Sequence, residues 1–323
     1  MIKEATDEQY EEKRMRMLIA GFPGIGKSTL GLSAPKALHI DVDFGRDRVD
    51  PQYRTAYIQP KSYEEVLDDL LPANISKYET LVFDTGGKLL DLMKPWAIKT
   101  DPKNGKRDGS LSLAGYGAVG REFIRLMDYC FYELDKHIVI LFHAKEEKEG
   151  DNTKLRLMIE GQSKDNVWQP IDLGGFVEMY GNDRSIGFSN CERYFAKGTR
   201  GINGIRKIPT LSEKVNNDFL ARLFEEYNSK AAVESEAAKK KREAYDKAVA
   251  AGAKIIDGVK DAKTANAAVP KLKEVEHALT SEFEVNNTFN TKTKELGLTV
   301  DKVKKAFVDP PAEDKTEDEK GAE

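Results

Sequence analysis

One segment, Gly21 to Ser28, constrains the fold of this chain more than any other. Its sequence, GFPGIGKS, matches every fixed position of the phosphate-binding pattern G-x-x-x-x-G-K-[ST]. The apolar run Met15 to Ala20 precedes it, and a helical stretch begins at Ser28. A strand, a glycine loop and a helix start in this order predict a nucleotide-binding α/β domain. A tight turn without a ligand is the alternative, but it leaves the flanking pattern unexplained.

The residue types in this loop suit the phosphates of a nucleotide and a magnesium ion. Glycines let the backbone wrap a phosphate chain with its N–H groups. Lys27 is expected to reach the β- and γ-phosphates, and the Ser28 hydroxyl is expected to ligate Mg²⁺. The residues predicted to bind ATP are Gly21, Phe22, Pro23, Gly24, Ile25, Gly26, Lys27, Ser28 and Thr29.

A second candidate element is the segment Tyr78 to Thr85, an apolar run that ends in a carboxylate. In a P-loop protein, an aspartate at the end of such a strand holds Mg²⁺ through its water shell. We therefore predict a metal site made of Ser28 and Asp84. The alternative is that Asp84 only caps the helix that follows the strand.

The remaining pattern predicts the order of strands. Ala37 to Val42 and His137 to Ala144 are apolar runs typical of buried strands. Shorter β-like pieces follow at 155–159, 176–180, 185–188 and 193–195. Strands that alternate with helices early and smaller strands late predict an α/β fold with a mostly parallel sheet and an antiparallel extension. Two polar segments, 99–117 and 145–154, are expected to be exposed loops.

Composition limits the classes of function. The charged share is 33% and the net charge is −4, so any nucleic-acid binding must depend on local basic patches. Cys130 and Cys191 are too few for a disulfide framework or a cysteine metal site, which fits a reducing compartment. The longest buried-looking run, Ile138 to Phe142, is too short to span a bilayer. These features favour a soluble, cytoplasmic protein with no membrane association.

The composition changes near Tyr227, where an Ala-, Lys- and Glu-rich helical stretch begins. We predict an ATPase domain at 1–228, a small helical accessory region at 229–309 and an acidic tail at 310–323. Later apolar residues, including Val300, Val303 and Phe307, are expected to belong to the core of the helical region. The tail contains 2 Lys and 6 Asp or Glu without large apolar residues, which predicts disorder.

Five segments together resemble the RecA-like ATPase core over Met15 to Ile205. They are GFPGIGKST, HIDVDFGRDRVDP, TLVFDT, IVILFHAKEEKE and FAKGTRGING. More narrowly, they resemble phage-encoded RecA-like P-loop ATPases of the single-strand annealing or recombination-mediator type. The resemblance implies slow Mg-ATP hydrolysis between subunits of a ring or filament, acting on single-stranded DNA in phage recombination or replication. A single-strand-binding or replication protein is a further implied partner, and the host cytoplasm is the implied location.

The resemblance also assigns catalytic roles. Asp43 matches the carboxylate that polarises the attacking water, although the recombinase pattern has Glu there. Asp41 is the competing candidate, and both aspartates also fit a loop start. His143 matches a polar sensor of the γ-phosphate, the alternative being a structural histidine.

Lys197 and Arg200 resemble a K-x-R element that related ATPases insert into a neighbouring subunit's site, with a spacing one residue longer. The alternative is a solvated basic turn. The complete set of predicted catalytic residues is Lys27, Asp43, Asp84, His143, Lys197 and Arg200.

The two polar segments correspond to RecA-like elements that face single-stranded DNA. Their cations are Lys99, Lys103, Lys106, Arg107, Lys145, Lys148, Lys154 and Arg156. Cations neutralise phosphates, but the second segment also contains several glutamates, so a surface-solubility role explains it equally well. Two alternative functions remain: a ring-forming helicase or loader subunit, and a nucleotide-switched interaction module with little turnover.

Overall fold

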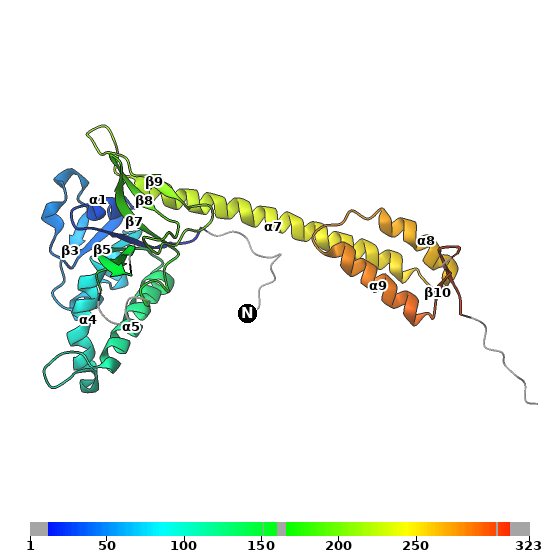
Figure 1. Ribbon diagram of the computed structural model, residues 1–323, viewed down its shortest axis with the longest axis horizontal. Helices are drawn as coiled ribbons and strands as arrows, with labels where there is room; N and C mark the ends of the chain where they lie inside the picture. Colours follow the sequence, from blue (N-terminus) through cyan, green and yellow to red (C-terminus); the bar gives the residue numbers. More distant parts are fainter. Residues whose placement is uncertain (1–11, 151, 160–165, 302, 311–323) are drawn as a thin grey trace, which may run out of the picture. The chain divides into compact units, whose positions relative to one another are not determined.

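The computed structural model describes residues 12–150, 152–159, 166–301 and 303–310 of the chain (Figure 1). Contacts divide the chain into two units, and the boundary between Ala231 and Ala232 falls within the helix α7, Phe219–Asp257. The sequence pattern places the corresponding boundary after residue 228. Apart from Pro310, the predicted acidic tail lies outside the described residues.

The larger unit is built around one sheet, which has nine strands in the described part of the chain. The strands are β1 Arg16–Gly21, β2 Ala37–Asp41, β3 Ala56–Ile58, β4 Thr80–Asp84, β5 His137–Glu149, β6 Asn152–Leu157, β7 Leu173–Tyr180, β8 Asp183–Gly187 and β9 Ile205–Lys207. The order β3-β2-β4-β5-β1-β7 is parallel throughout, and β8 and β9 continue it antiparallel. The predicted fold class is confirmed.

The strands at the centre are apolar on both faces because helices cover both sides of the sheet. Leu18 and Ala20 of β1 belong to the core under α2, α4 and α5. Met17 and Ile19 pack on the other face with α1 and the first turns of α7. The helices of this unit, with their short helical turns, are α1 Lys27–Gly31, η1 Arg46–Arg48, η2 Pro51–Tyr53, α2 Tyr63–Asp69, α3 Pro72–Ile75, α4 Gly86–Thr100, η3 Pro102–Asn104, α5 Leu113–Asp128 and η4 Tyr129–Glu133.

The polar segment 145–154 is not a loop, contrary to the sequence prediction. β5 continues to Glu149 and pairs antiparallel with β6 to form a ribbon. Charges of opposite sign meet on this ribbon: Lys154 forms an ion pair with Glu149, and Arg156 lies 3.5 Å from the same carboxylate. Cross-strand ion pairs of this kind support a strand pair with little apolar content.

Two other boundaries differ from the prediction. The loop after α4 is shorter, because Ser112 caps α5 by accepting a hydrogen bond from the Gly115 N–H. Residues 193–195 are irregular instead of extended, and the last strand of the sheet is β9.

In the smaller unit, α8 Ala262–Lys273 and α9 Ser281–Glu295 form a core with the end of α7. Asp261 and Thr264 form a reciprocal capping box at the start of α8. After α9 the chain forms a hairpin, β10 Thr299–Asp301 and β11 Ala306–Val308, where the sequence pattern predicts helix. Phe307 of β11 packs against the core, as predicted. Val303 lies in the turn of this hairpin and is 92% exposed.

None of the helices in the described segments combines the length and the apolar character needed to cross a bilayer.

Candidate nucleotide-binding site

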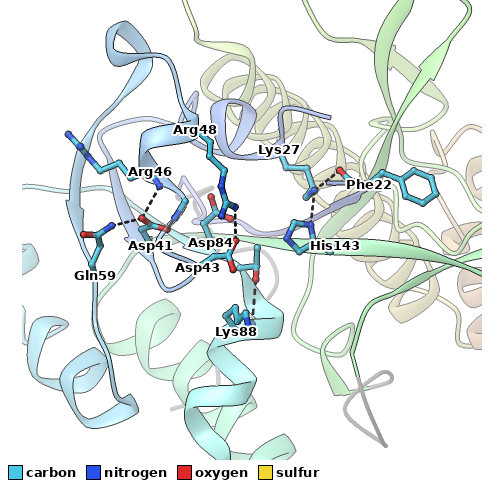
Figure 2. Close-up of polar contacts among 12 residues, drawn as sticks. Phe22, Lys27, Asp41, Asp43, Arg46, Arg48, Gln59, Asp84, Lys88 and His143 are labelled. Carbon is cyan, nitrogen blue, oxygen red and sulfur yellow. Dashed lines mark hydrogen bonds and ion pairs between the residues drawn. The ribbon is translucent and has the colours of Figure 1, made fainter. Parts of the chain in front are cut away.

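The candidate site lies at the carboxyl ends of the parallel strands, beyond β1, β2, β4 and β5 (Figure 2). The register places Gly21 of β1 beside His143 of β5, and Asp41 of β2 beside Asp84 of β4. Loops at the carboxyl ends of such strands form the usual ligand crevice of an open α/β sheet. The structure thereby brings together four of the six predicted catalytic residues: Lys27, Asp43, Asp84 and His143.

The phosphate loop has the backbone conformation that its glycines allow. Gly24 and Gly26 have φ angles of 80° and 86°, in the left-handed region that side chains disfavour. Gly26 is also the N-cap residue of α1, which begins at Lys27. The loop glycines are therefore needed for its shape as well as for close approach to a ligand.

Lys27 is almost completely buried, and its ammonium lies within this loop. Its Nζ donates a 2.8 Å hydrogen bond to the carbonyl oxygen of Phe22 and lies 3.3 Å from His143 Nδ1 (Figure 2). Burial lowers the pKa of Lys27 to about 8, against the opposing effect of the Asp84 and Asp43 carboxylates. An ammonium in this environment gains from an anionic ligand.

Asp84 is a buried carboxylate at the end of β4. Its Oδ2 lies 3.3 Å from Nε2 of His39, which is also buried. Burial raises the pKa of Asp84, but hydrogen bonds from His39 and Ser28 and the charge of Lys27 lower it more, so its pKa is below the ordinary value. An ionised carboxylate and the neighbouring Ser28 hydroxyl are oxygen ligands that suit Mg²⁺.

His39 was not among the predicted site residues, although the sequence contains a signal for it. His39, Asp41 and Asp43 alternate within and just after a buried strand, which places polar groups on one side of an otherwise apolar element.

Asp41 has a structural role in the loop after β2. It is fully buried, and its carboxylate accepts hydrogen bonds from the backbone N–H groups of Gly45 (2.8 Å) and Arg46 (3.0 Å) and from the Gln59 amide (2.8 Å) (Figure 2). Three donors occupy this carboxylate, which favours the loop-forming interpretation for Asp41.

Asp43 lies in a different environment at the same edge. Its side chain is 19% exposed, and its one described ion pair is with Arg48 at 3.1 Å. Its backbone N–H donates to the carbonyl oxygen of Asp84 at 3.1 Å, which fixes it beside β4. Of the two aspartates, Asp43 has the carboxylate better placed to meet a ligand.

His143 is half-buried next to Lys27. Burial, together with the Lys27 charge, lowers the pKa of its imidazole. The ring is therefore neutral at pH 7 and retains one N–H donor and one acceptor nitrogen.

Lys197 and Arg200 lie toward the other edge of the sheet, at the amino ends of its parallel strands. The backbone of Lys197 pairs with Gly174 near the start of β7, and its ammonium donates to the Ile171 carbonyl. The Arg200 guanidinium is 5.4 Å from the centroid of the Tyr227 ring, on the first part of α7. These two cations are not brought to the phosphate loop of their own chain.

One basic residue that was not predicted does approach the loop. Nη1 of Arg184 in β8 fills the space that a Cβ atom on Gly26 would occupy. The sequence around Arg184 has no motif, because its position depends on how β8 folds back along β7.

A cavity of about 340 Å³ opens beside His143, between α4, α5 and the β5–β6 ribbon. Lys88, Tyr116 and Lys145 are among the residues that line it. In the ribbon, Lys145 is 3.7 Å from Glu147, and Lys154 and Arg156 pair with Glu149.

The fold and the site define a P-loop ATPase domain. The model of a family described as AAA domain matches residues 13–200, more than half of the chain, and the chain belongs to this family. No curated protein matches the sequence. Among solved structures, one similar chain is an ATPase from the type III secretion system of pathogenic bacteria. It is 11% identical with a TM-score of 0.33, and the match covers 51% of this chain and 52% of that one, so this chain spans about half its length.

Proposed function

We propose that this AAA-family domain hydrolyses ATP slowly with Mg²⁺, assembles into a ring or filament, and acts on single-stranded DNA in phage recombination or replication. The observation that carries the proposal is the meeting of Lys27, Asp43 and Asp84 at one edge of the sheet. Each comes from a different strand end, as the catalytic groups of phosphoryl-transfer sites do.

The residues present fit a nucleotide with its metal ion. Ser28 and Asp84 would hold Mg²⁺, which keeps several of its waters and needs only one or two carboxylates. Bound Mg²⁺ would supply charge neutralisation on the phosphates. Lys27 would pair with the β- and γ-phosphates and recover the charge stabilisation that its burial removes.

Turnover would depend on Asp43. A carboxylate within hydrogen-bond reach of a water orients it for in-line attack. Asp43 has one methylene less than glutamate, and Arg48 already pairs with it. Both features support slow hydrolysis. They also favour the second candidate function, a nucleotide-switched interaction module with little turnover.

Assembly into oligomers is supported by the position of Lys197 and Arg200. Because they lie away from the phosphate loop of their own chain, a catalytic role for them requires a neighbouring subunit. A cation supplied across an interface would offset the charge that develops on the phosphoryl oxygens. The same arrangement also suits a helicase or loader subunit.

The DNA proposal is supported by the cavity beside His143. Lys88 and Lys145 supply cations there, and Tyr116 supplies an aromatic ring. Proteins bind single-stranded nucleic acids with this combination of cations and stacking rings. His143 borders both the cavity and Lys27, so a strand bound there would contact a residue of the nucleotide site.

The test is the ATPase rate of the full chain with and without single-stranded DNA, measured across a salt series. We expect stimulation that decreases as salt rises, because phosphate contacts release counterions. Lys27→Ala is the control for contaminating ATPases. Turnover that no DNA stimulates at any salt would contradict the DNA role, whereas nucleotide binding without turnover would decide for the switched module.

A further inference from the structure

Arg184 lies at the phosphate loop although it is far from the loop in sequence. It is the second residue of β8 and pairs with Met179 of β7. β7 runs parallel to β1, so the turn between β7 and β8 lies at the edge where the phosphate loop lies. The close approach of its Nη1 atom to the Cβ position of Gly26 places the guanidinium directly against the residue before Lys27.

The charge of Arg184 is not balanced by neighbouring acids. The carboxylate of Asp183 pairs with Lys207 at 2.7 Å, and Glu178 pairs with Arg193 at 3.1 Å. Within the described segments, no carboxylate or carbonyl oxygen accepts a hydrogen bond from the Arg184 guanidinium. Burial alone lowers the pKa of this half-buried group. A partly desolvated cation of this kind is stabilised when an anion pairs with it.

The sheet order tells which end of a nucleotide Arg184 would meet. β1 lies between β5 and β7. Asp43, Asp84 and His143 come from the β5 side, through β2, β4 and β5. Arg184 comes from the β7 side. Because the carboxylates that hold the metal and orient the water must lie at the reacting γ-phosphate, the β7 side corresponds to the other end of the phosphate chain.

We propose that Arg184 is a phosphate ligand of the bound nucleotide, that it acts within its own chain, and that it contacts the α- or β-phosphate that ATP and ADP share. The proposal rests on nucleotide binding at the phosphate loop. It differs from the roles of Lys197 and Arg200, which concern the γ-phosphate of a neighbouring subunit.

A contact to shared phosphates has a distinct signature. Loss of one charge-assisted hydrogen-bonding group weakens binding by about 10- to 100-fold. The loss is expected to be equal for MgATP and MgADP, with kcat nearly unchanged, because the contact is the same in the ground state and the transition state. A cation at the γ-phosphate would instead lower kcat and leave MgADP affinity unchanged.

The experiment measures MgATP and MgADP affinity by calorimetry, and kcat separately, for wild type, Arg184→Met and Arg184→Lys. Lys207→Met, on the adjacent strand, is the matched control for removing a cation from the same antiparallel extension. We expect Arg184→Met to lose affinity for both nucleotides, Arg184→Lys to lose less, and Lys207→Met to bind like wild type. Unfolding temperatures without nucleotide should be close for all four proteins.

Wild-type affinity of Arg184→Met for MgADP, or a loss confined to kcat or to MgATP, would overturn the proposal. If Arg184→Met is poorly folded, the same comparison between Arg184→Lys and wild type decides, because lysine keeps the charge but not the fork of donors. Binding is measured separately from turnover. A wild-type protein that binds both nucleotides but does not hydrolyse ATP would contradict the proposed ATPase function and leave the comparison of affinities intact.

Discussion

The two edges of the parallel sheet carry basic residues in contrasting surroundings. At the carboxyl edge, Lys27 is buried between a carbonyl oxygen and His143, with Asp84 and Asp43 nearby. Toward the amino edge, Lys197 bonds to a backbone carbonyl and Arg200 packs on an aromatic ring. The first group is assembled within one chain at the phosphate loop, whereas the second lies toward the amino ends of the parallel strands.

The difference shows how sequence motifs should be weighed. The carboxyl ends of parallel strands lie at the same edge of the sheet. A motif at one of these ends therefore lies beside the residues at the neighbouring strand ends. The basic motif at Lys197 and Arg200 lies away from these strand ends, so the catalytic role proposed for it needs a second subunit. Substitutions at the two edges are therefore expected to have different effects.

The largest effect is expected for Lys27→Ala. It removes the cation that would face the β- and γ-phosphates, and we expect MgATP affinity to fall by about 100-fold or more. Calorimetric titration measures the loss, and an unchanged unfolding temperature without nucleotide shows that the fold is intact. Affinity near wild type would refute the phosphate-loop assignment.

Asp43→Asn should leave MgATP affinity largely in place and reduce kcat by about 100-fold. The amide keeps the size of the side chain but cannot accept a proton from the water. Single-turnover hydrolysis measures the effect.

Asp41→Asn is the matched comparison for Asp43. Because Asp41 accepts three hydrogen bonds that hold its loop, its replacement should lower the unfolding temperature. Its replacement should lower kcat less than Asp43→Asn does. A larger loss of kcat for Asp41→Asn than for Asp43→Asn would show that the base is assigned to the wrong aspartate.

A smaller effect is expected from pH. The pKa of Lys27 is lowered to about 8, so the unliganded protein loses this charge as pH rises through 8. Phosphates bind the charged form, so MgATP affinity should fall above pH 8, by up to about tenfold per pH unit, with proton uptake on binding. Lys27→Arg stays charged and should show a flat profile over the same range. Identical profiles for the two proteins would contradict the role of burial.

Much of the carboxyl edge can be predicted from sequence, because glycine spacing and strand-ending aspartates are local signals. The ribbon of β5 and β6 cannot, since its alternating charges look like a solvated loop until cross-strand partners are known. Asp41 and Asp43 were indistinguishable until the structure placed Gln59 beside Asp41. Arg184 has no local signal at all, because only the return of β8 along β7 brings it to Gly26.

We propose that the carboxyl edge binds the nucleotide within one chain, and that Lys197 and Arg200 at the amino edge complete catalysis in the site of a neighbouring subunit. The direct test mixes Lys27→Ala protein with a Lys197→Ala/Arg200→Ala double variant and measures ATPase activity. We expect each variant to be inactive alone and co-assembled mixtures to recover activity, since one subunit supplies the loop and the other supplies the cations. No recovery in oligomers shown to contain both variants, or full activity of the double variant alone, would contradict it.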